Sequence, residues 1–261
     1  MDRMIILGSG SAAGVPTISA GWGNCNPENP KNRRSRAGVY VEIGDTKILI
    51  DTSADLRNQL IDNHIEHIDA VLYTHTHADH TAGIDDLRAM TYHHSTPLNV
   101  YATAAHMQNL HERFAYVFND YTGSDATHRP LLKMNIIRYR ETFRIGDIEI
   151  LPLEFAGHPM PTTGFLLNRG KILLVPDYKY ILPETMAVLE KFDVDVLIMP
   201  LTNIDACPYH AGMEDDMRYI KQINPQKVFF THMSQYCDYD AVEAMSAPNM
   251  HPANDGLIID L

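Results

Sequence analysis

The chain has 261 residues, of which 45% are hydrophobic and 21% charged, enough to bury a sizeable core in one large α/β domain or two small ones. It holds no run of about 18 apolar residues, so no membrane span is expected, and the apolar stretch near its start is too short for a signal peptide. The formal net charge of −12 argues against a long polyanion such as RNA or DNA and favours a small anion held by metal ions and a few arginines.

The first half of the chain alternates strand and helix patterns. Residues 1–10 are typical of a strand that runs into a glycine-rich loop, and Gly44-Asp45 joins two β-like runs as a hairpin turn would. Ser53 is predicted to cap a helix. In chain order, the further predicted strands of this half are 39–43, 47–51 and 69–74, and the predicted helices are 53–61, 84–90 and 103–118.

Residues 119–130 are polar and irregular, which is typical of a surface loop or lid. Beyond them, the predicted strands are 135–139, 148–155, 164–168, 171–175, 194–199, 227–231 and 256–261, and the predicted helices are 183–192 and 213–223. Strand-rich blocks with hairpins are thus followed by strand–helix units, twice over. This arrangement favours two sheets packed face to face with helices outside, although periodicity alone supports only α/β or α+β.

The three cysteines, Cys25, Cys207 and Cys237, lie far apart and form no CxxC pair. Their spacing argues against a disulfide framework and against a cysteine-based structural zinc site, so each is interpreted as a small packing residue. The pattern fits a reducing compartment, and a cytoplasmic protein is predicted.

The strongest chemical motif is the run HTHADH at residues 75–80, directly after a predicted buried strand. In an extended loop His75 and His77 point the same way, so both imidazoles can reach one metal ion. Asp79 and His80 then turn toward a neighbouring position. Imidazole together with carboxylate suits zinc, manganese or iron, and the alternative is a solvated polar loop.

Four residues cannot complete two coordination spheres, so further ligands are expected at other strand ends. His158 follows the predicted strand 148–155, Asp177 follows 171–175, and His232 follows 227–231. A carboxylate at Asp177 can bridge two ions. Each residue taken singly could be a capping or hydrogen-bonding group, but together with the first motif they form a recurring pattern of ligands at strand ends.

His210 lies just before a predicted helix, where a capping or surface role is as plausible as a catalytic one. The remaining histidines receive no functional role, although His93, His94 and His128 could line a pocket. These histidines are His64, His67, His93, His94, His106, His111, His128 and His251.

Residues 74–80, with Gly83 after them, resemble the HxHxDH motif of the metallo-β-lactamase superfamily, and the resemblance extends over nearly the whole chain. Residues 7–16 and 79–88 resemble the branch that contains the phosphoribosyl 1,2-cyclic phosphate phosphodiesterases. Residues 231–235 are similar to the last ligand motif of that branch and of the tRNA 3′-processing endonucleases. The resemblance implies a four-layer αββα sandwich, here taken as one domain over residues 1–261.

The resemblance also implies a site with two divalent metal ions, zinc or manganese. In this implied site one ion is held by His75, His77 and His158, the other by Asp79, His80 and His232, and Asp177 bridges them. Asp79 is therefore counted as a catalytic residue as well as a ligand. His210 matches a histidine that in the phosphodiesterase branch contacts the phosphate and acts as a general acid.

One departure from that branch concerns its cysteine-rich structural zinc site, of which only Cys25 remains in this chain. Residues 24–36 take its place, and residues 31–36 within them form a local basic run. Arg33, Arg34 and Arg36 are candidates to bind substrate phosphate, because guanidinium groups match phosphate oxygens. The alternative is a solvated loop. Arg88 is expected to brace Asp85 or Asp86.

The predicted function is a dinuclear-metal hydrolase, foremost a phosphodiesterase on a small cyclic or nucleotide-like phosphodiester. Two metal ions lower the pKa of a water toward neutrality, and the hydroxide attacks phosphorus while His210 protonates the leaving oxygen. Two alternatives stay open: a thioester or lactam hydrolase of the same superfamily, and a non-catalytic binding or carrier protein of cofactor biosynthesis. The expected partner is a small anionic phosphodiester, with no membrane and no long nucleic acid, and a homodimer stays open.

Overall fold

A computed structural model describes residues 2–91, 96–119 and 131–261 of the chain. His93, His94 and His128 lie outside the described residues. Of the predicted loop or lid over residues 119–130, only Asn119 is described, as an exposed bend after a short helix.

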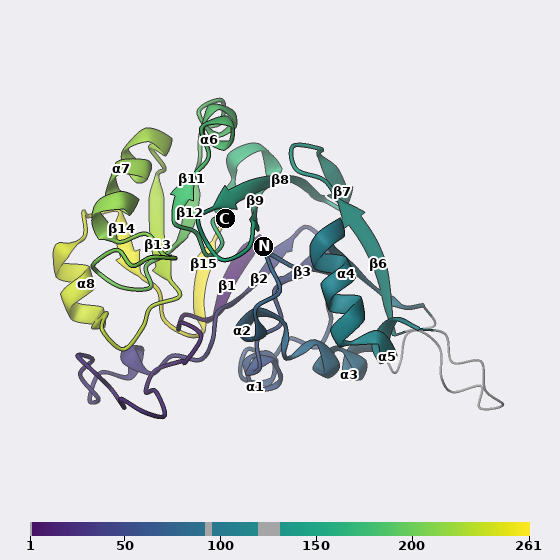
Figure 1. Cartoon of the computed structure of the whole chain (residues 1–261), viewed down its shortest axis with the longest axis horizontal. Helices are drawn as coiled ribbons and strands as arrows, with labels where there is room; N and C mark the ends of the chain where they lie inside the picture. Colours follow the sequence, from purple (N-terminus) through teal and green to yellow (C-terminus); the bar gives the residue numbers. More distant parts are fainter. Residues whose placement is uncertain (1, 92–95, 120–130) are drawn as a thin grey trace.

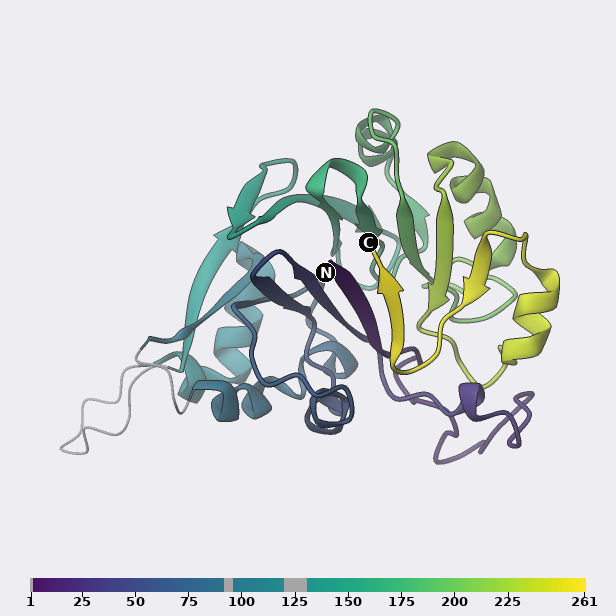
Figure 2. The same cartoon turned by 180° about the vertical axis from the view of Figure 1, so that it is seen from behind.

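The first sheet of the described chain has seven strands in the order β15-β1-β2-β3-β4-β5-β6. Figures 1 and 2 show the last strand of the chain beside the first, with α1 to α5 on the outer face of this sheet. The strands are β1 (Arg3–Gly8), β2 (Gly38–Ile43), β3 (Thr46–Ile50), β4 (Ala70–Leu72), β5 (Leu98–Thr103), β6 (Leu132–Ile137) and β15 (Leu257–Asp260). The helices are α1 (Leu56–Asp62), α2 (Ala78–Thr81), η2 (Ile84–Asp86), α3 (Leu87–Thr91), α4 (Ala104–Arg113) and α5 (Ala115–Phe118), with η1 (Pro30–Asn32) in the loop between β1 and β2.

The second sheet follows the order β11-β8-β9-β10-β12-β13-β14, and β7 also pairs with β8. Its strands are β7 (Phe143–Ile145), β8 (Ile148–Ala156), β9 (Thr162–Leu167), β10 (Ile172–Leu174), β11 (Tyr180–Ile181), β12 (Val196–Pro200), β13 (Lys227–Thr231) and β14 (Met250–Pro252). Its helices are α6 (Pro183–Leu189), α7 (Met213–Ile223) and α8 (Tyr239–Met245), with η3 (Asn168–Gly170) between β9 and β10. Figure 1 shows α6, α7 and α8 on the side away from the first sheet.

Three apolar layers hold the four structural layers together. One cluster lies between the sheets and includes Ile6, Ile48 and Phe165, while two others pack each sheet against its own helices. Successive residues of a strand face opposite sides, so a strand buried on both faces reads as a continuous apolar run. In β1, for example, Ile6 faces the other sheet and Ile5 faces the helices. This architecture is the αββα sandwich that the sequence predicts.

Two Gly-Asp turns tie the sheets together at one end. Gly44 (φ 58°) and Gly146 (φ 49°) each open a two-residue hairpin turn, a position that requires positive φ. The side chain of Asp147 accepts the backbone N–H of Asp45 at 3.1 Å, and Thr46 Oγ1 accepts the N–H of Asp147 at 2.8 Å. The predicted hairpin at Gly44 is confirmed, and the second hairpin, with the same Gly-Asp pair, was not predicted.

The structure corrects several predicted elements. The first helix begins at Leu56 after Asp55, and Ser53 instead bonds the N–H of Asp55 at 3.2 Å. The predicted helix 103–118 is two helices, because the backbone at Phe114 is not helical (φ −128°, ψ 37°). The predicted strand 135–139 lies further toward the N-terminus, as β6. Elements that were not predicted include β5, β7, β11, β14, α2 and α8.

Across residues 2–91, 96–119 and 131–261, no helix combines the length and the apolar character needed to cross a bilayer.

Candidate metal centre

The loop after β4 supplies the first two side chains of the centre. Nε2 of His75 lies 3.2 Å from Nδ1 of His77, and the His77 backbone is extended (φ −64°, ψ 153°). Helix α2 begins directly afterwards and turns Asp79 and His80 toward an adjacent position. The structure therefore places these four side chains as the motif predicts.

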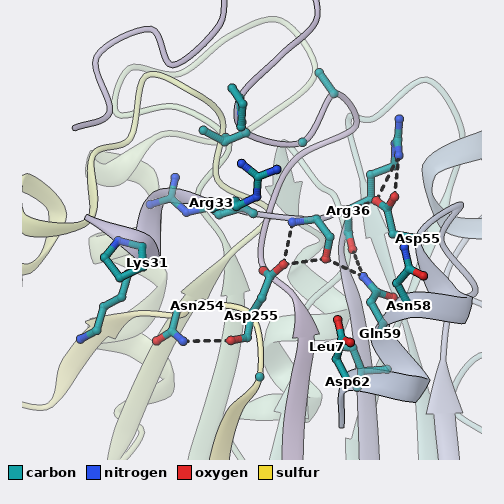
Figure 3. Close-up of a pocket in the computed structure, with 18 of the residues that line it drawn as sticks. Leu7, Lys31, Arg33, Arg36, Asp55, Asn58, Gln59, Asp62, Asn254 and Asp255 are labelled. Atoms are coloured by element: carbon teal, nitrogen blue, oxygen red, sulfur yellow. Dashed lines mark hydrogen bonds and ion pairs between the residues drawn. The ribbon is translucent and has the colours of Figure 1, made fainter. Parts of the chain in front are cut away.

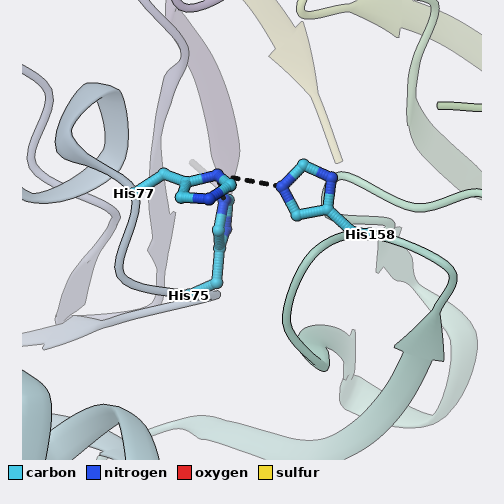
Figure 4. Close-up of side chains that lie close together, drawn as sticks. All are labelled: His75, His77 and His158. Carbon is cyan, nitrogen blue, oxygen red and sulfur yellow. Dashed lines mark hydrogen bonds between the residues drawn. The ribbon is translucent and has the colours of Figure 1, made fainter. Parts of the chain in front are cut away.

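His158, from the loop after β8, completes the first cluster (Figure 4). Its Nε2 lies 2.9 Å from Nδ1 of His77, and its ring centroid is 5.2 Å from that of His75. The three rings point their nitrogens at one another although 81 residues separate His158 from His77 in sequence. This convergence gives the geometry of a three-histidine cation site.

The second cluster joins Asp79 and His80 to Asp177 and His232. Nε2 of His232 lies 3.4 Å from Asp79 Oδ2 and 3.3 Å from Asp177 Oδ2. Nε2 of His80 lies 3.2 Å from Asp79 Oδ2 and 3.7 Å from Asp177 Oδ2. His80, Asp177 and His232 are each less than 5% exposed, so these side chains face one another away from solvent.

The donor set fits divalent metal ions. Two atoms bound at about 2.0–2.1 Å to a tetrahedral zinc lie roughly 3.3–3.4 Å apart, which is close to the separations in both clusters. His80 Nε2 is buried and forms no hydrogen bond in spite of its carboxylate neighbours. A buried polar atom without a partner is costly, and a cation at this point would satisfy it.

Burial and neighbouring charge set the ionisation of the centre. Burial holds the pKa of His75 well below its usual range, with His80 adding to the effect. Burial by itself raises the pKa of Asp177, but the charges of His232 and His80 outweigh it and hold that pKa well below its usual range. A neutral imidazole and an ionised carboxylate are the forms that bind a metal ion.

Asp51 orients His80 from behind. Its carboxylate accepts a hydrogen bond from Nδ1 of His80 at 2.7 Å. It also accepts hydrogen bonds from the backbone N–H (2.8 Å) and the hydroxyl (2.7 Å) of Thr74. In a neutral His80 that donates Nδ1–H to Asp51, Nε2 has no proton and faces the second cluster, as a metal ligand must. Burial lowers the pKa of His80, but Asp51 and the carboxylates of the cluster outweigh it and raise that pKa well above its usual range. Asp51 was not predicted as a site residue.

Helix α4 fixes two loops that carry ligands. Nε2 of His106 lies 2.8 Å from the carbonyl oxygen of Pro161, and Nη1 of Arg113 donates to the carbonyl oxygen of Thr76. These carbonyls belong to the loops of His158 and of the 75–80 motif. The helix therefore holds the two loops in register, a role that its sequence did not predict.

His210 lies beside both clusters. Its ring packs edge-on against His158 (centroids 5.0 Å apart) and stacks on His232 (5.8 Å), and one of its ring nitrogens is within 4.8 Å of a ligand atom of Asp177. Burial lowers the pKa of His210 to about 4. At neutral pH the imidazole is therefore neutral, with one N–H to donate.

A family model described as a beta-lactamase superfamily domain matches residues 46–233. The chain belongs to the metallo-β-lactamase superfamily. The histidine and aspartate clusters of the chain are compatible with the divalent metals of the superfamily.

Two curated relatives share substantial identity with this superfamily member. An octanoyltransferase of Porphyromonas gingivalis is 33% identical over 99% of the chain and 52% of its own length. A ribonuclease Z of Methanopyrus kandleri is 31% identical over 58% of the chain and 50% of its own length. The chain spans about half the length of the curated relatives it matches.

Among solved structures, a diphosphatase from the PhnP family superposes with a TM-score of 0.88 at 24% identity, covering 100% of this chain and 98% of that one. At this identity the likeness shows the fold.

The three candidate phosphate-binding arginines lie apart from the ligand clusters. Arg33 and Arg36 line a cavity of about 1000 Å³ between the loop after β1 and helix α1 (Figure 3). None of the seven candidate metal ligands, all of them described, lines it. Arg36 is paired with Asp55 at 3.0 Å. Substrate contact by Arg33 and Arg36 stays a prediction, and their placement away from the ligands does not favour it.

Arg34 has a structural role, and its burial does not favour the substrate contact, which stays a prediction. Its side chain is 2% exposed, and its guanidinium donates to the carbonyls of Ser234 (3.3 Å) and Cys237 (2.8 Å) and to Asn32 Oδ1 (3.1 Å). It joins the loop after β1 to the segment that follows His232.

We expect Arg34→Lys to lower the free energy of unfolding by about 2 kcal/mol, because one ammonium cannot reach both carbonyls and the amide. Urea unfolding followed by circular dichroism measures the change. Arg33→Lys is the matched control, because Arg33 is exposed, and it should change stability by less than about 0.5 kcal/mol. Equal stability of the two variants would contradict the role of Arg34.

A buried pair fastens the Asp177 segment to helix α7. The hydroxyl of Tyr178 donates to Asp216 Oδ1 at 2.5 Å, and Asp216 Oδ2 is buried without a hydrogen-bond partner. Burial raises the pKa of Asp216 to about 7, a shift that the nearby charge of Asp215 increases and that Tyr178 and Lys179 oppose.

The Asp216 carboxyl should make stability depend on pH. Its folded pKa of about 7 exceeds the unfolded value of 3.8, so from about pH 4 to 7 the folded state keeps a proton that the unfolded state has released. The free energy of unfolding should therefore fall as pH rises through this window. In Asp216→Asn the free energy of unfolding should fall less steeply with pH, because the folded state no longer keeps this one extra proton. Urea unfolding between pH 5 and pH 8 measures the difference. If the free energies of unfolding of the two proteins change equally with pH, the raised pKa of Asp216 is refuted.

A sequence signal could have identified Asp51. Strands β3 and β4 are parallel, with Ile50 opposite Leu72, so Asp51 and the 75–80 motif leave the same sheet edge. An acidic residue at the end of the neighbouring strand is thus a candidate partner for a ligand histidine. No comparable sequence signal identifies Thr202, whose hydroxyl lies between the imidazoles of His210 and His232.

Proposed function

We propose that this chain is a metal-dependent phosphodiesterase that hydrolyses a small cyclic or nucleotide-like phosphodiester with two divalent ions, zinc or manganese. His75, His77 and His158 would hold one ion, Asp79, His80 and His232 the other, with Asp177 between them.

The position of His210 carries the proposal. Neither of the two proposed ligand sets includes it, and its half-buried ring lies against His158 and His232. A phosphodiester has non-bridging oxygens and a leaving oxygen that develop charge during hydrolysis, and an N–H at this place can stabilise them. The diphosphatase neighbour and the ribonuclease Z relative, whose names both denote phosphorus chemistry, support the same reaction class.

Asp51, Asp177 and His210 have different roles in the proposed hydrolysis. Divalent ions, when bound, supply a water of lowered pKa and positive charge for phosphoryl oxygens. Asp51 keeps His80 in the tautomer that binds a cation, and the carboxylate of Asp177 brings negative charge to both ligand sets. His210 donates a hydrogen bond to a phosphate oxygen. Burial lowers the pKa of His210 although Asp177 raises it, so the imidazole is neutral at neutral pH and acts as a hydrogen-bond donor.

A small substrate agrees with the charge of the protein. With a formal net charge of −12, the chain repels a long polyanion at a distance, whereas a small anion is attracted by the ions alone.

The test compares substrates on protein loaded with zinc or with manganese. We expect hydrolysis of bis(p-nitrophenyl) phosphate and faster hydrolysis of a five-membered ribose cyclic phosphate. Chelation by EDTA should abolish the activity, and added metal should restore it. A metal-loaded protein that is inactive on both diesters contradicts the proposal.

The second candidate is thioester hydrolysis, which the octanoyltransferase relative favours, since its name denotes acyl transfer and its match covers 99% of this chain. An octanoyl thioester and S-lactoylglutathione are the substrates that separate the two chemistries. Cleavage of either thioester with both diesters left intact would establish carbonyl chemistry. Inactivity on all four substrates would favour a binding or carrier protein.

A further inference from the structure

Thr202 links the candidate metal centre to His210. It follows β12, and its hydroxyl oxygen lies 3.1 Å from Nδ1 of His232 and 3.2 Å from Nδ1 of His210. One hydroxyl thus bridges an imidazole of the second cluster and the imidazole of His210.

The backbone holds this bridge in place. Strands β12 and β13 are parallel, with Pro200 opposite Thr231, and the N–H of Leu201 donates to the carbonyl of Thr231 at 2.8 Å. The carbonyl of Thr202 accepts the N–H of Ser234 at 3.1 Å. His232 itself has a left-handed backbone (φ 53°), which only a fixed surrounding maintains. Thr202 and His232 therefore leave two strand ends that are bonded to each other, and His210 reaches them from the loop before α7.

The number of protons on the three side chains determines which atom donates in each of the two hydrogen bonds of the Thr202 hydroxyl. Nε2 of His232 faces Asp79 and Asp177, so when it binds a cation it has no proton and Nδ1 carries the N–H. That N–H donates to the Thr202 oxygen. The single proton of the hydroxyl is then free to go to Nδ1 of His210, which accepts it. A neutral His210 that accepts at Nδ1 must carry its own proton at Nε2.

We propose that Thr202 is a positioning residue that fixes His210 in the Nε2–H tautomer, so that its N–H and not a lone pair faces the substrate. The catalytic use of this N–H rests on the proposed function, whereas the tautomer does not. Without the hydroxyl, Nδ1 of His210 has no hydrogen-bond partner among residues 2–91, 96–119 and 131–261, and the ring loses a bond that sets its rotation.

The decisive measurement is a ¹⁵N–¹H correlation spectrum of the histidine rings in zinc-loaded protein without substrate. Protonated and unprotonated ring nitrogens of a neutral imidazole are distinguished by their ¹⁵N shifts, and the signals of His210 are assigned by their loss in His210→Gln. We expect the Nε2–H form in the unchanged protein and in Thr202→Ser. In Thr202→Val, which keeps the shape and removes the hydroxyl, we expect a mixture of tautomers or the Nδ1–H form.

Kinetics and metal analysis complete the test. Thr202→Val should lower kcat on a phosphodiester about tenfold, the effect of one hydrogen bond that orients a donor, with KM changed less than about twofold. Thr202→Ser should restore most of the rate. Because Thr202→Val also removes a hydrogen bond to His232, the rates are compared at a zinc excess that gives all three proteins the same measured zinc content. An Nδ1–H tautomer in the unchanged protein, or an unchanged tautomer in Thr202→Val, overturns the proposal. Failure of the proposed function would instead show as absence of diester hydrolysis in the unchanged protein.

Discussion

Asp177→Asn should lose more than about 100-fold in turnover and should bind fewer divalent ions than the unchanged chain. Loss of a group that only supports a ligand costs about 10–100-fold in affinity or activity, and loss of a direct ligand should exceed that. Oδ2 of Asp177 lies 3.3 Å from Nε2 of His232, and the residue belongs to two of the three side-chain groups that could hold a cation. An asparagine keeps the shape but removes the negative charge and one ligand oxygen.

Mass spectrometry of bound metal together with steady-state kinetics measures both effects. Asp215→Asn is the matched control, because it removes the same charge from helix α7, where Asp215 pairs with exposed Arg218 at 2.9 Å. The control should keep its metal content and rate. Full turnover and unchanged metal content in Asp177→Asn would remove Asp177 from the centre.

Asp51→Asn should weaken both the fold and the metal centre, although Asp51 is not a candidate ligand. Its two oxygens accept three donors, two from Thr74 and one from Nδ1 of His80. If the amide oxygen keeps the N–H of Thr74, the amide nitrogen faces His80, whose Nδ1 must then accept. The proton of His80 moves to Nε2, which points into the second cluster and can no longer bind a cation.

For this variant we expect a loss of about 3 kcal/mol in the free energy of unfolding, the upper part of the range for leaving buried hydrogen-bonding groups without their partner. We also expect metal affinity about 10–100-fold lower. Urea unfolding and competition with a chromogenic chelator measure the two quantities.

The control for Asp51→Asn is Asp69→Asn, which breaks a second aspartate–histidine pair of similar length. Oδ1 of Asp69 lies 2.9 Å from Nε2 of His67, but these side chains are 36% and 42% exposed, against 6% and 5% for Asp51 and His80. A surface pair contributes about 1 kcal/mol or less, and this one is remote from the ligands. Equal effects of the two substitutions would show that burial of the Asp51 pair is unimportant.

Much of the fold was predictable because its strands are short and apolar on both faces. The run from Met4 to Leu7 is a continuous apolar stretch, whereas the strand 148–155 alternates buried apolar residues with the half-buried Glu149 and Glu154. The elements that were not predicted are weaker signals. The two-residue strand Tyr180–Ile181 and the three-residue strand Met250–Pro252 are too short for any period, and both form because a neighbouring strand offers hydrogen bonds.

In the basic run at residues 31–36, the local charge pattern did not predict the structural role of Arg34. A basic hexapeptide segment of an acidic chain suggested phosphate binding, yet Arg34 is buried among carbonyl oxygens that arrive about 200 residues later in the sequence. Local charge cannot tell which arginine will meet such carbonyls, because that depends on where the two loops pack.

The sequence alone determined which chemical groups the centre has: imidazoles and carboxylates at the ends of apolar strands, in a spacing of 75, 77, 79 and 80 that one loop and one helical turn convert into two neighbouring sites. Only the tertiary structure decided which other groups complete and support them. Asp51, Thr202, His106 and Arg113 act through hydrogen bonds whose length and direction depend on the packing of parallel strand ends and of helix α4. A hydrogen bond requires atoms about 3 Å apart, and no local pattern in a chain specifies distances of that size between distant segments.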